Sequence, residues 1–82
     1  MMDLETIRKQ IDMIDDQIIA LLIQRYDLVL DVKAYKDKHQ VPVLDQSREK
    51  QIYQKLESTK YHHQLKEIFQ LLMALSRDMQ TS

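Results

Sequence analysis

The sequence contains no glycine, no cysteine and a single proline. Turns between strands commonly need glycine, so its absence favours an all-helical chain, and the absence of cysteine excludes disulfides. The formal net charge of −1 does not provide the basic surface typical of nucleic-acid binders. No apolar run approaches the roughly 18 residues of a membrane span, and no targeting segment stands at the N-terminus. We therefore expect a cytoplasmic protein with no nucleic-acid or membrane partner.

The chain is organised around a segment from residue 4 to about residue 40 that contains neither glycine nor proline. Apolar side chains recur there at alternating steps of three and four, which predicts one long helix with a single apolar face. This apolar stripe consists of Leu4, Ile7, Ile11, Ile14, Ile18, Leu21, Leu28, Val32 and Tyr35.

A helix of that length measures about 55 Å, at roughly 1.5 Å per residue. A compact domain of 82 residues has a diameter of only about 30 Å. Part of the apolar stripe would therefore face water within one chain, and we expect a second copy to cover it in a two-fold homodimer.

The single proline, Pro42, ends this helix because proline restricts the preceding residue to extended backbone. Asp45 is a suitable N-cap for a second helix, predicted from residue 46 to about 57. A third helix is predicted from about residue 63 to 80, with its apolar face inward. The inward residues of that face are Leu65, Ile68, Phe69, Leu72, Leu75 and Met79. The chain thus reads as one domain, 1–82, with three helices.

Polar residues lie on or beside these apolar faces, and a buried cation needs a partner. Arg25 interrupts the stripe of the first helix, and Lys36 lies on nearly the same face about 16 Å further along. The full candidate set is Arg8, Arg25, Lys36, Asp45, Arg48, Glu49, Ser76 and Gln80. Four cations against two anions would suit a ligand with two carboxylates.

Arg8 lies seventeen residues before Arg25, or about 25 Å along one helix, so the two cannot meet within a subunit. In an antiparallel pairing of two first helices, Arg8 could reach the site around Arg25 of the other chain. Taken singly, each candidate has a simpler explanation: Arg25 could set helix register, Lys36 could be solvated and Asp45 could serve only as a cap.

The order Arg, Arg, Lys, Asp-x-x-Arg-Glu and Ser-x-x-x-Gln on three such helices resembles the all-helical chorismate mutase family of the short, monofunctional, dimeric type. The resemblance extends over nearly the whole chain. It implies an intertwined homodimer that rearranges chorismate to prephenate in the shikimate pathway, toward aromatic amino acids. It also implies that neither cofactor nor metal is needed, because the reaction is a unimolecular pericyclic step.

The resemblance implies a role for each candidate. Arg25 and the partner subunit's Arg8 would grip carboxylates with help from Ser76, while Lys36 and Gln80 would donate hydrogen bonds toward the ether oxygen. The expected catalytic residues are Arg25, Lys36, Glu49 and Gln80.

The acids have roles of their own in this scheme. Glu49, aided by the Asp45 region, would accept the ring hydroxyl, and Arg48 would contact substrate or orient the acids. Arg77, beside Ser76, stands where an apolar residue would be unsurprising. We expect it to point to solvent or toward Asp78, because an inward arginine would make the site too positive.

Two other functions suit the same pattern. An isochorismate pyruvate lyase would share the arginine and lysine clamp, and a non-catalytic helical dimerisation or regulatory module would need none of it. A complex with another shikimate-pathway enzyme is compatible with each. His39, His62 and His63 do not indicate a metal site, since adjacent histidines on a helix diverge by about 100°.

Overall fold

The computed structural model describes residues 3–81 and is all-helical there, with three helices and no strand. The helices are α1 (Leu4–His39), α2 (Gln46–Glu57) and α3 (His62–Thr81). The predicted boundaries are confirmed to within one residue. Among the described residues, no helix is long and apolar enough to cross a membrane.

The ends of α1 follow from local chemistry. Asp3 is the N-cap, and its side chain accepts a hydrogen bond of 2.8 Å from the backbone N–H of Thr6. This bond lowers the pKa of the Asp3 carboxyl. At the other end Gln40 adopts the left-handed conformation, with φ of 57°, and closes the helix by donating its backbone N–H to the carbonyl of Lys36. Residues 41–45 then run without helix past Pro42 to the N-cap of α2, as predicted.

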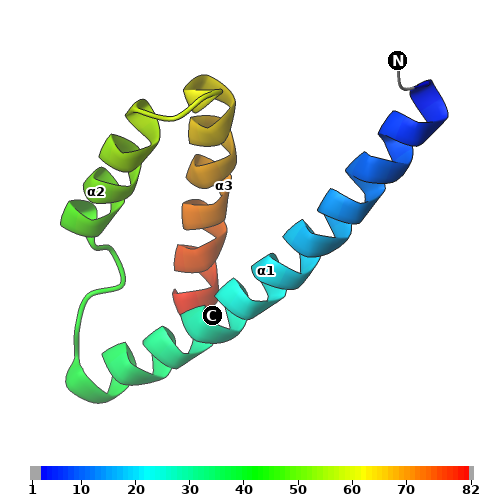
Figure 1. The fold of residues 1–82 in the computed structure, drawn as a ribbon. Helices are drawn as coiled ribbons and strands as arrows, with labels where there is room; N and C mark the ends of the chain where they lie inside the picture. Colours follow the sequence, from blue (N-terminus) through cyan, green and yellow to red (C-terminus); the bar gives the residue numbers. More distant parts are fainter. Residues whose placement is uncertain (1–2, 82) are drawn as a thin grey trace.

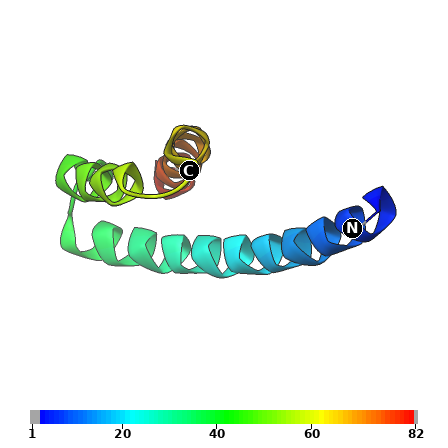
Figure 2. The same cartoon turned by 45° about the horizontal axis from the view of Figure 1, so that its top comes forward.

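The three helices form an open V rather than a compact bundle. Figure 1 shows that the C-terminal end of α3 meets α1 near its middle, and that α2 lies beside α3. Both shorter helices lie over the C-terminal half of α1 and on the same side of it, whereas its N-terminal half extends away alone (Figure 2). The molecule measures 56 × 25 × 14 Å, so α1 extends beyond its own domain as predicted.

The core of the single chain is small. The buried residues among those described are Val29, Leu56, Met73 and Ser76. Side chains of the α1 stripe are exposed instead, from 38% for Ile7 to 63% for Leu28. The inward orientation predicted for Ile68 and Leu75 is wrong within one chain, where they are 54% and 43% exposed.

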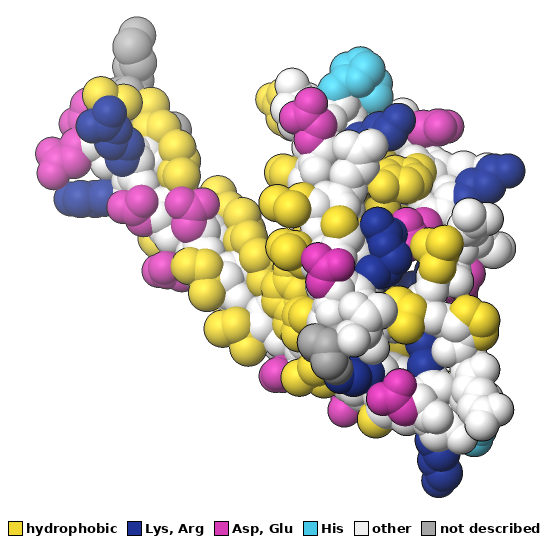
Figure 3. All heavy atoms as spheres, turned by 180° about the vertical axis from the view of Figure 1, so that it is seen from behind, with side chains coloured by type: hydrophobic (Ala, Val, Ile, Leu, Met, Phe, Trp, Pro, Cys, Tyr) yellow, Lys and Arg dark blue, Asp and Glu magenta, His cyan; other side chains and the backbone are white. Residues whose placement is uncertain are grey.

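These exposed apolar side chains are not scattered. Seen from behind, hydrophobic atoms run along the N-terminal half of α1 and along the facing side of α3, so that both arms of the V carry apolar surface (Figure 3). Contiguous apolar surface of this kind is typical of protein–protein contacts. The apolar V is the name used below for the surface formed by Ile7, Ile11, Ile14, Ile18, Ile68, Leu71 and Leu75.

Candidate active site

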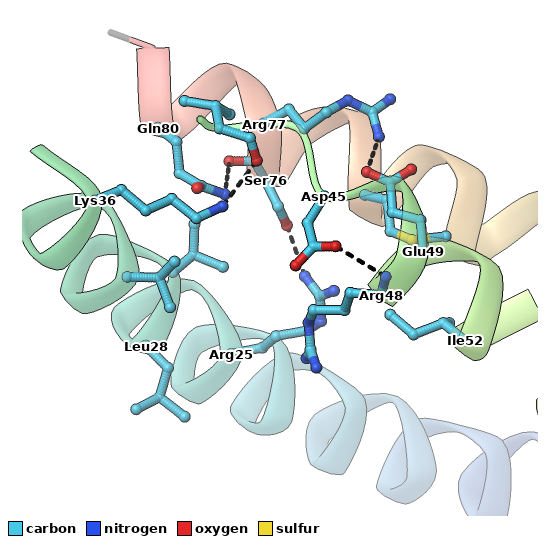
Figure 4. A pocket seen from close by; sticks show the side chains of 14 residues that line it. Arg25, Leu28, Lys36, Asp45, Arg48, Glu49, Ile52, Ser76, Arg77 and Gln80 are labelled. Atoms are coloured by element: carbon cyan, nitrogen blue, oxygen red, sulfur yellow. Dashed lines mark hydrogen bonds and ion pairs between the residues drawn. The ribbon is translucent and has the colours of Figure 1, made fainter. Parts of the chain in front are cut away.

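A cavity of about 480 Å³ lies between the C-terminal half of α1, the start of α2 and the end of α3, a size within the usual range of small-molecule sites. Seven of the eight predicted site residues line it, and Figure 4 shows most of them around a common space. Its polar lining consists of Arg25, Lys36, Asp45, Arg48, Glu49, Ser76, Arg77 and Gln80. Its apolar lining consists of Leu28, Val29, Val32, Val43, Ile52 and Met73.

Arg25 links α1 to α3. Its Nη1 donates a hydrogen bond of 2.6 Å to Oγ of Ser76, which in turn donates to the backbone carbonyl of Leu72. Ser76 is 7% exposed, so this pair sits at the floor of the cavity. The partner that an arginine on the apolar face required is therefore a serine of the same chain. Because Ser76 is neutral, the positive charge of Arg25 is not cancelled by it.

Lys36 is fixed by the extended segment that follows α1. Its Nζ donates to the backbone carbonyl of Val43 at 2.8 Å, across the turn made by Gln40 and Pro42. A lysine ammonium has three N–H donors, so this bond leaves two for a ligand. Lys36 is half-buried rather than fully solvated.

Asp45 and Arg48 come from the first turn of α2. Oδ1 of Asp45 accepts a hydrogen bond of 3.0 Å from the backbone N–H of Arg48, so Asp45 is the N-cap as predicted. The cap uses one carboxylate oxygen, and the other is open to the cavity side. In Figure 4 the side chains of Arg48 and Arg25 extend from opposite walls into the same space. Two cations facing each other favour an anion between them.

Glu49 and Arg77 form an ion pair between α2 and α3, in which Arg77 Nη1 donates to Glu49 Oε2. Arg77 lines the cavity with its side chain 35% exposed, and it pairs with Glu49, a partner that our expectation of solvent or Asp78 did not include. The reason is the half-buried carboxylate of Glu49, one helix away, which offers a stronger partner than water. The hydrogen bond to Glu49 raises the pKa of the Arg77 guanidinium.

Gln80 lies one turn beyond Ser76 on the same face of α3. Its Nε2 donates to the backbone carbonyl of Ser76 at 3.2 Å, and the second hydrogen of that amide remains for a ligand. Its Oε1 is buried and has no hydrogen-bond partner among the described residues. Buried polar atoms without a partner are uncommon and often mark a place where a ligand or water completes the bonding.

Arg8 is the one predicted site residue that does not line the cavity. It is exposed in the first turns of α1, within the N-terminal half that extends away from the other helices. This agrees with the spacing along the helix, which places Arg8 and Arg25 about 25 Å apart within one subunit. No other described residue of the N-terminal half of α1 lines the cavity either.

The cavity carries more positive than negative charge within one chain. Its lining has four cations, Arg25, Lys36, Arg48 and Arg77, against the anions Asp45 and Glu49. The excess is therefore two positive charges, as predicted, but the fourth cation within one chain is Arg77 and not Arg8. In residues 3–81 there is no group of three or more histidines or acids placed to hold a metal ion.

Sequence reasoning missed the role of Arg77 and most of the apolar lining. The signal was available, because Arg77 and Gln80 are three residues apart and so lie about 60° apart on α3. An arginine at that angle faces the same side as Gln80. The partner on α2 could not be identified from the helix alone.

Comparison with known proteins gives a consistent result. A model of the family described as chorismate mutase type II matches residues 7–81. The chain belongs to this family. The resemblance seen in the sequence is thereby confirmed at the level of the family, over nearly the whole chain.

The chain is also similar to a protein of Methanocaldococcus jannaschii that is named chorismate mutase. It is 35% identical, and the match covers 94% of this chain and 83% of the relative. No solved structure gives a significant match to the chain.

Proposed function

We propose that this chain is a chorismate mutase, which converts chorismate to prephenate by a Claisen rearrangement. The observation that carries the proposal is the cavity, which is lined by seven of the predicted site residues from the three-helix chain. The chain that forms this cavity belongs to the chorismate mutase type II family. The named relative from Methanocaldococcus jannaschii supports the same reaction.

The reaction depends more on holding the substrate in a reactive conformation than on nucleophilic or acid–base catalysis by side chains. Chorismate carries two carboxylates, and its enolpyruvyl arm must fold over the ring before the new carbon–carbon bond can form. Fixing that folded conformer lowers the barrier by removing rotational freedom in advance. Arg25, held by Ser76, and Arg48 would grip the carboxylates from opposite walls of the cavity. The lining of one chain carries an excess of two positive charges, which favours a dianion, and the partner's Arg8 would add a third.

Negative charge grows on the ether oxygen as its bond to the ring breaks. Fixed donors aimed at that oxygen stabilise the transition state more than the ground state. Lys36 has two free donors after its bond to Val43, and Gln80 has one after its bond to Ser76. We assign these two residues to the ether oxygen, with Arg25, Lys36, Glu49 and Gln80 as the catalytic set.

The ring hydroxyl of the substrate needs an acceptor. Glu49 lines the cavity, and Arg77 occupies only its Oε2. We assign the hydroxyl to Glu49, with Asp45 beside it at the start of α2. No metal or cofactor is required by this scheme, because no bond in the substrate is attacked by an external nucleophile.

The proposal includes a two-fold homodimer. The apolar V would be covered if the N-terminal half of one α1 lay between α1 and α3 of the partner. An antiparallel arrangement of this kind would bring Arg8 to the partner's cavity as a further carboxylate ligand. A cytoplasmic location is part of the same proposal.

The test is the rate of chorismate disappearance with the purified dimer, followed by ultraviolet absorbance, with prephenate identified as the product and isochorismate assayed in parallel. We expect prephenate to form and Arg25→Ala to lose this activity. Release of pyruvate from isochorismate with no prephenate would establish the lyase instead. A folded dimer inert toward both substrates would refute catalysis by this chain alone.

A further inference from the structure

Arg77 has no contact with the substrate in the scheme derived above, yet it lines the cavity and holds one of the catalytic residues. It belongs to α3, whereas Glu49 belongs to the first turn of α2. Their side chains are 35% and 22% exposed, so the pair lies at the rim of the cavity rather than in bulk water. Ion pairs with this degree of burial keep their geometry better than those on an open surface.

The pair occupies a defined part of the carboxylate. Arg77 donates to Oε2, and a carboxylate oxygen that is already bonded and charge-balanced is a poorer acceptor for a second partner. Oε1 of Glu49 has no bond within the described residues. The side chain is therefore held by one oxygen and presents the other, which is the arrangement a ligand hydroxyl needs.

Arg77 also prevents a competing contact. Arg48 precedes Glu49 in sequence and lines the same cavity, and its guanidinium has no ion pair among the described residues. Without Arg77, the remaining cations of this lining face the substrate, and a contact of Glu49 with one of them, such as Arg48, would replace the present ion pair. That contact would consume both the hydroxyl acceptor and a carboxylate donor.

We propose that Arg77 is a positioning residue, which fixes Glu49 through Oε2 so that Oε1 accepts the ring hydroxyl of the substrate. The inference rests on the proposed function and deepens it, because it names how the enzyme recognises the hydroxyl. Arg77 itself does not touch the substrate. Its contribution is therefore visible only for ligands that carry the hydroxyl.

The experiment compares Arg77→Met, which keeps the length of the side chain without its charge, with Arg77→Lys, which keeps a charge. With chorismate, Arg77→Met should lower kcat/KM about tenfold, the value of one charge-assisted hydrogen bond, and Arg77→Lys should recover part of the loss. Lys50→Met is the matched control, because it removes a cation from an exposed position beside Glu49 that does not line the cavity. It should leave kcat/KM unchanged.

The discriminating measurement uses a substrate that lacks the ring hydroxyl. On deoxy-chorismate, wild-type protein and Arg77→Met should be equal within about twofold, since the hydrogen bond in question cannot form. Arg77→Met in a Glu49→Gln background should likewise cost little beyond Glu49→Gln alone. A tenfold loss that persists with the deoxy substrate would overturn the inference, because it would assign Arg77 a general role in holding α2 against α3.

Binding separates this inference from the proposed function. The dissociation constants of a non-reactive bicyclic ether dicarboxylate, with and without the hydroxyl, would be measured by calorimetry on the same variants. Wild-type protein that neither turns over chorismate nor binds either ligand would refute the proposed function. Wild-type protein that does both, with an Arg77→Met variant that binds the hydroxylated ligand equally well, would refute the role of Arg77 alone.

Discussion

The two halves of α1 contain the same alternation of apolar residues but have different surroundings. In the C-terminal half, Val29 is buried and Arg25 and Lys36 have partners from α3 and from the following segment. In the N-terminal half no described residue is buried, and Ile11, Ile14 and Ile18 are each about half exposed. The comparison teaches that the periodicity of apolar residues predicts which face of a helix is apolar. It does not predict whether that face is covered within the same chain. The C-terminal half has partners for its polar residues within one subunit, although Leu28 there is still 63% exposed, whereas the N-terminal half extends away from the other helices.

The largest expected effect comes from a charge placed in the apolar V. Ile14→Asp would bury a carboxylate without a partner at the proposed subunit contact, so we expect dimer formation and activity to be lost together. Sedimentation velocity and the chorismate assay measure the two effects. Ala20→Asp adds the same charge about 120° away around α1 and should leave a dimer. A wild-type protein that is a folded monomer at micromolar concentration would remove the basis of this prediction.

A complementation experiment tests whether the N-terminal half of α1 serves the partner's cavity. Arg8→Ala and Arg25→Ala homodimers should each be nearly inactive, because every cavity would lack one arginine. After subunit exchange, half of the dimers in an equal mixture are mixed, and each has one cavity with both arginines. We therefore expect on the order of a quarter of the wild-type activity to return. No recovery, once exchange has been shown by mass spectrometry, would place Arg8 outside the site.

A third prediction concerns the C-terminal half of α1. Lys36→Ala should lower kcat by about a hundredfold, since losing one donor to a developing oxyanion costs about 3 kcal/mol of barrier. Lys38→Ala, at an exposed position in the same turn, is the control and should have no effect on kcat. Equal values of kcat for the two variants would remove Lys36 from the catalytic set.

The smallest effect lies in the connection between α2 and α3. Tyr61 has a φ of 62°, a left-handed conformation that costs a residue with a Cβ about 1 kcal/mol. Tyr61→Gly should therefore be about 1 kcal/mol more stable to urea than Tyr61→Ala, which lacks the tyrosine ring but keeps the Cβ. Both variants lose the contact between Lys60 and the Tyr61 ring, so their difference reports the backbone. Identical midpoints would show that this conformation carries no strain.

Much of this molecule could be predicted from the sequence, for identifiable reasons. Helix ends depend on neighbours in the chain, so Pro42 and Asp45 were sufficient to place the end of α1 and the start of α2. The site residues followed from polar residues on apolar faces and from the resemblance to a family. The pairing of Arg77 was not predicted because it depends on Glu49 from another helix, which the periodicity of α3 does not contain. The exposure of Ile68 and Leu75 was missed because an amphipathic pattern does not say whether the apolar face is covered within one chain.

The length of α1 has a thermodynamic consequence. If a substrate is gripped by Arg25 of one chain and by the partner's Arg8, its affinity includes the free energy of bringing the two chains together. Linkage then works in both directions, so that substrate must tighten the dimer by the factor by which the dimer tightens substrate binding. The activity per molecule would fall on dilution, and saturating substrate would shift that fall to lower protein concentration. In such an enzyme the concentration of the protein itself acts as a regulator of its activity.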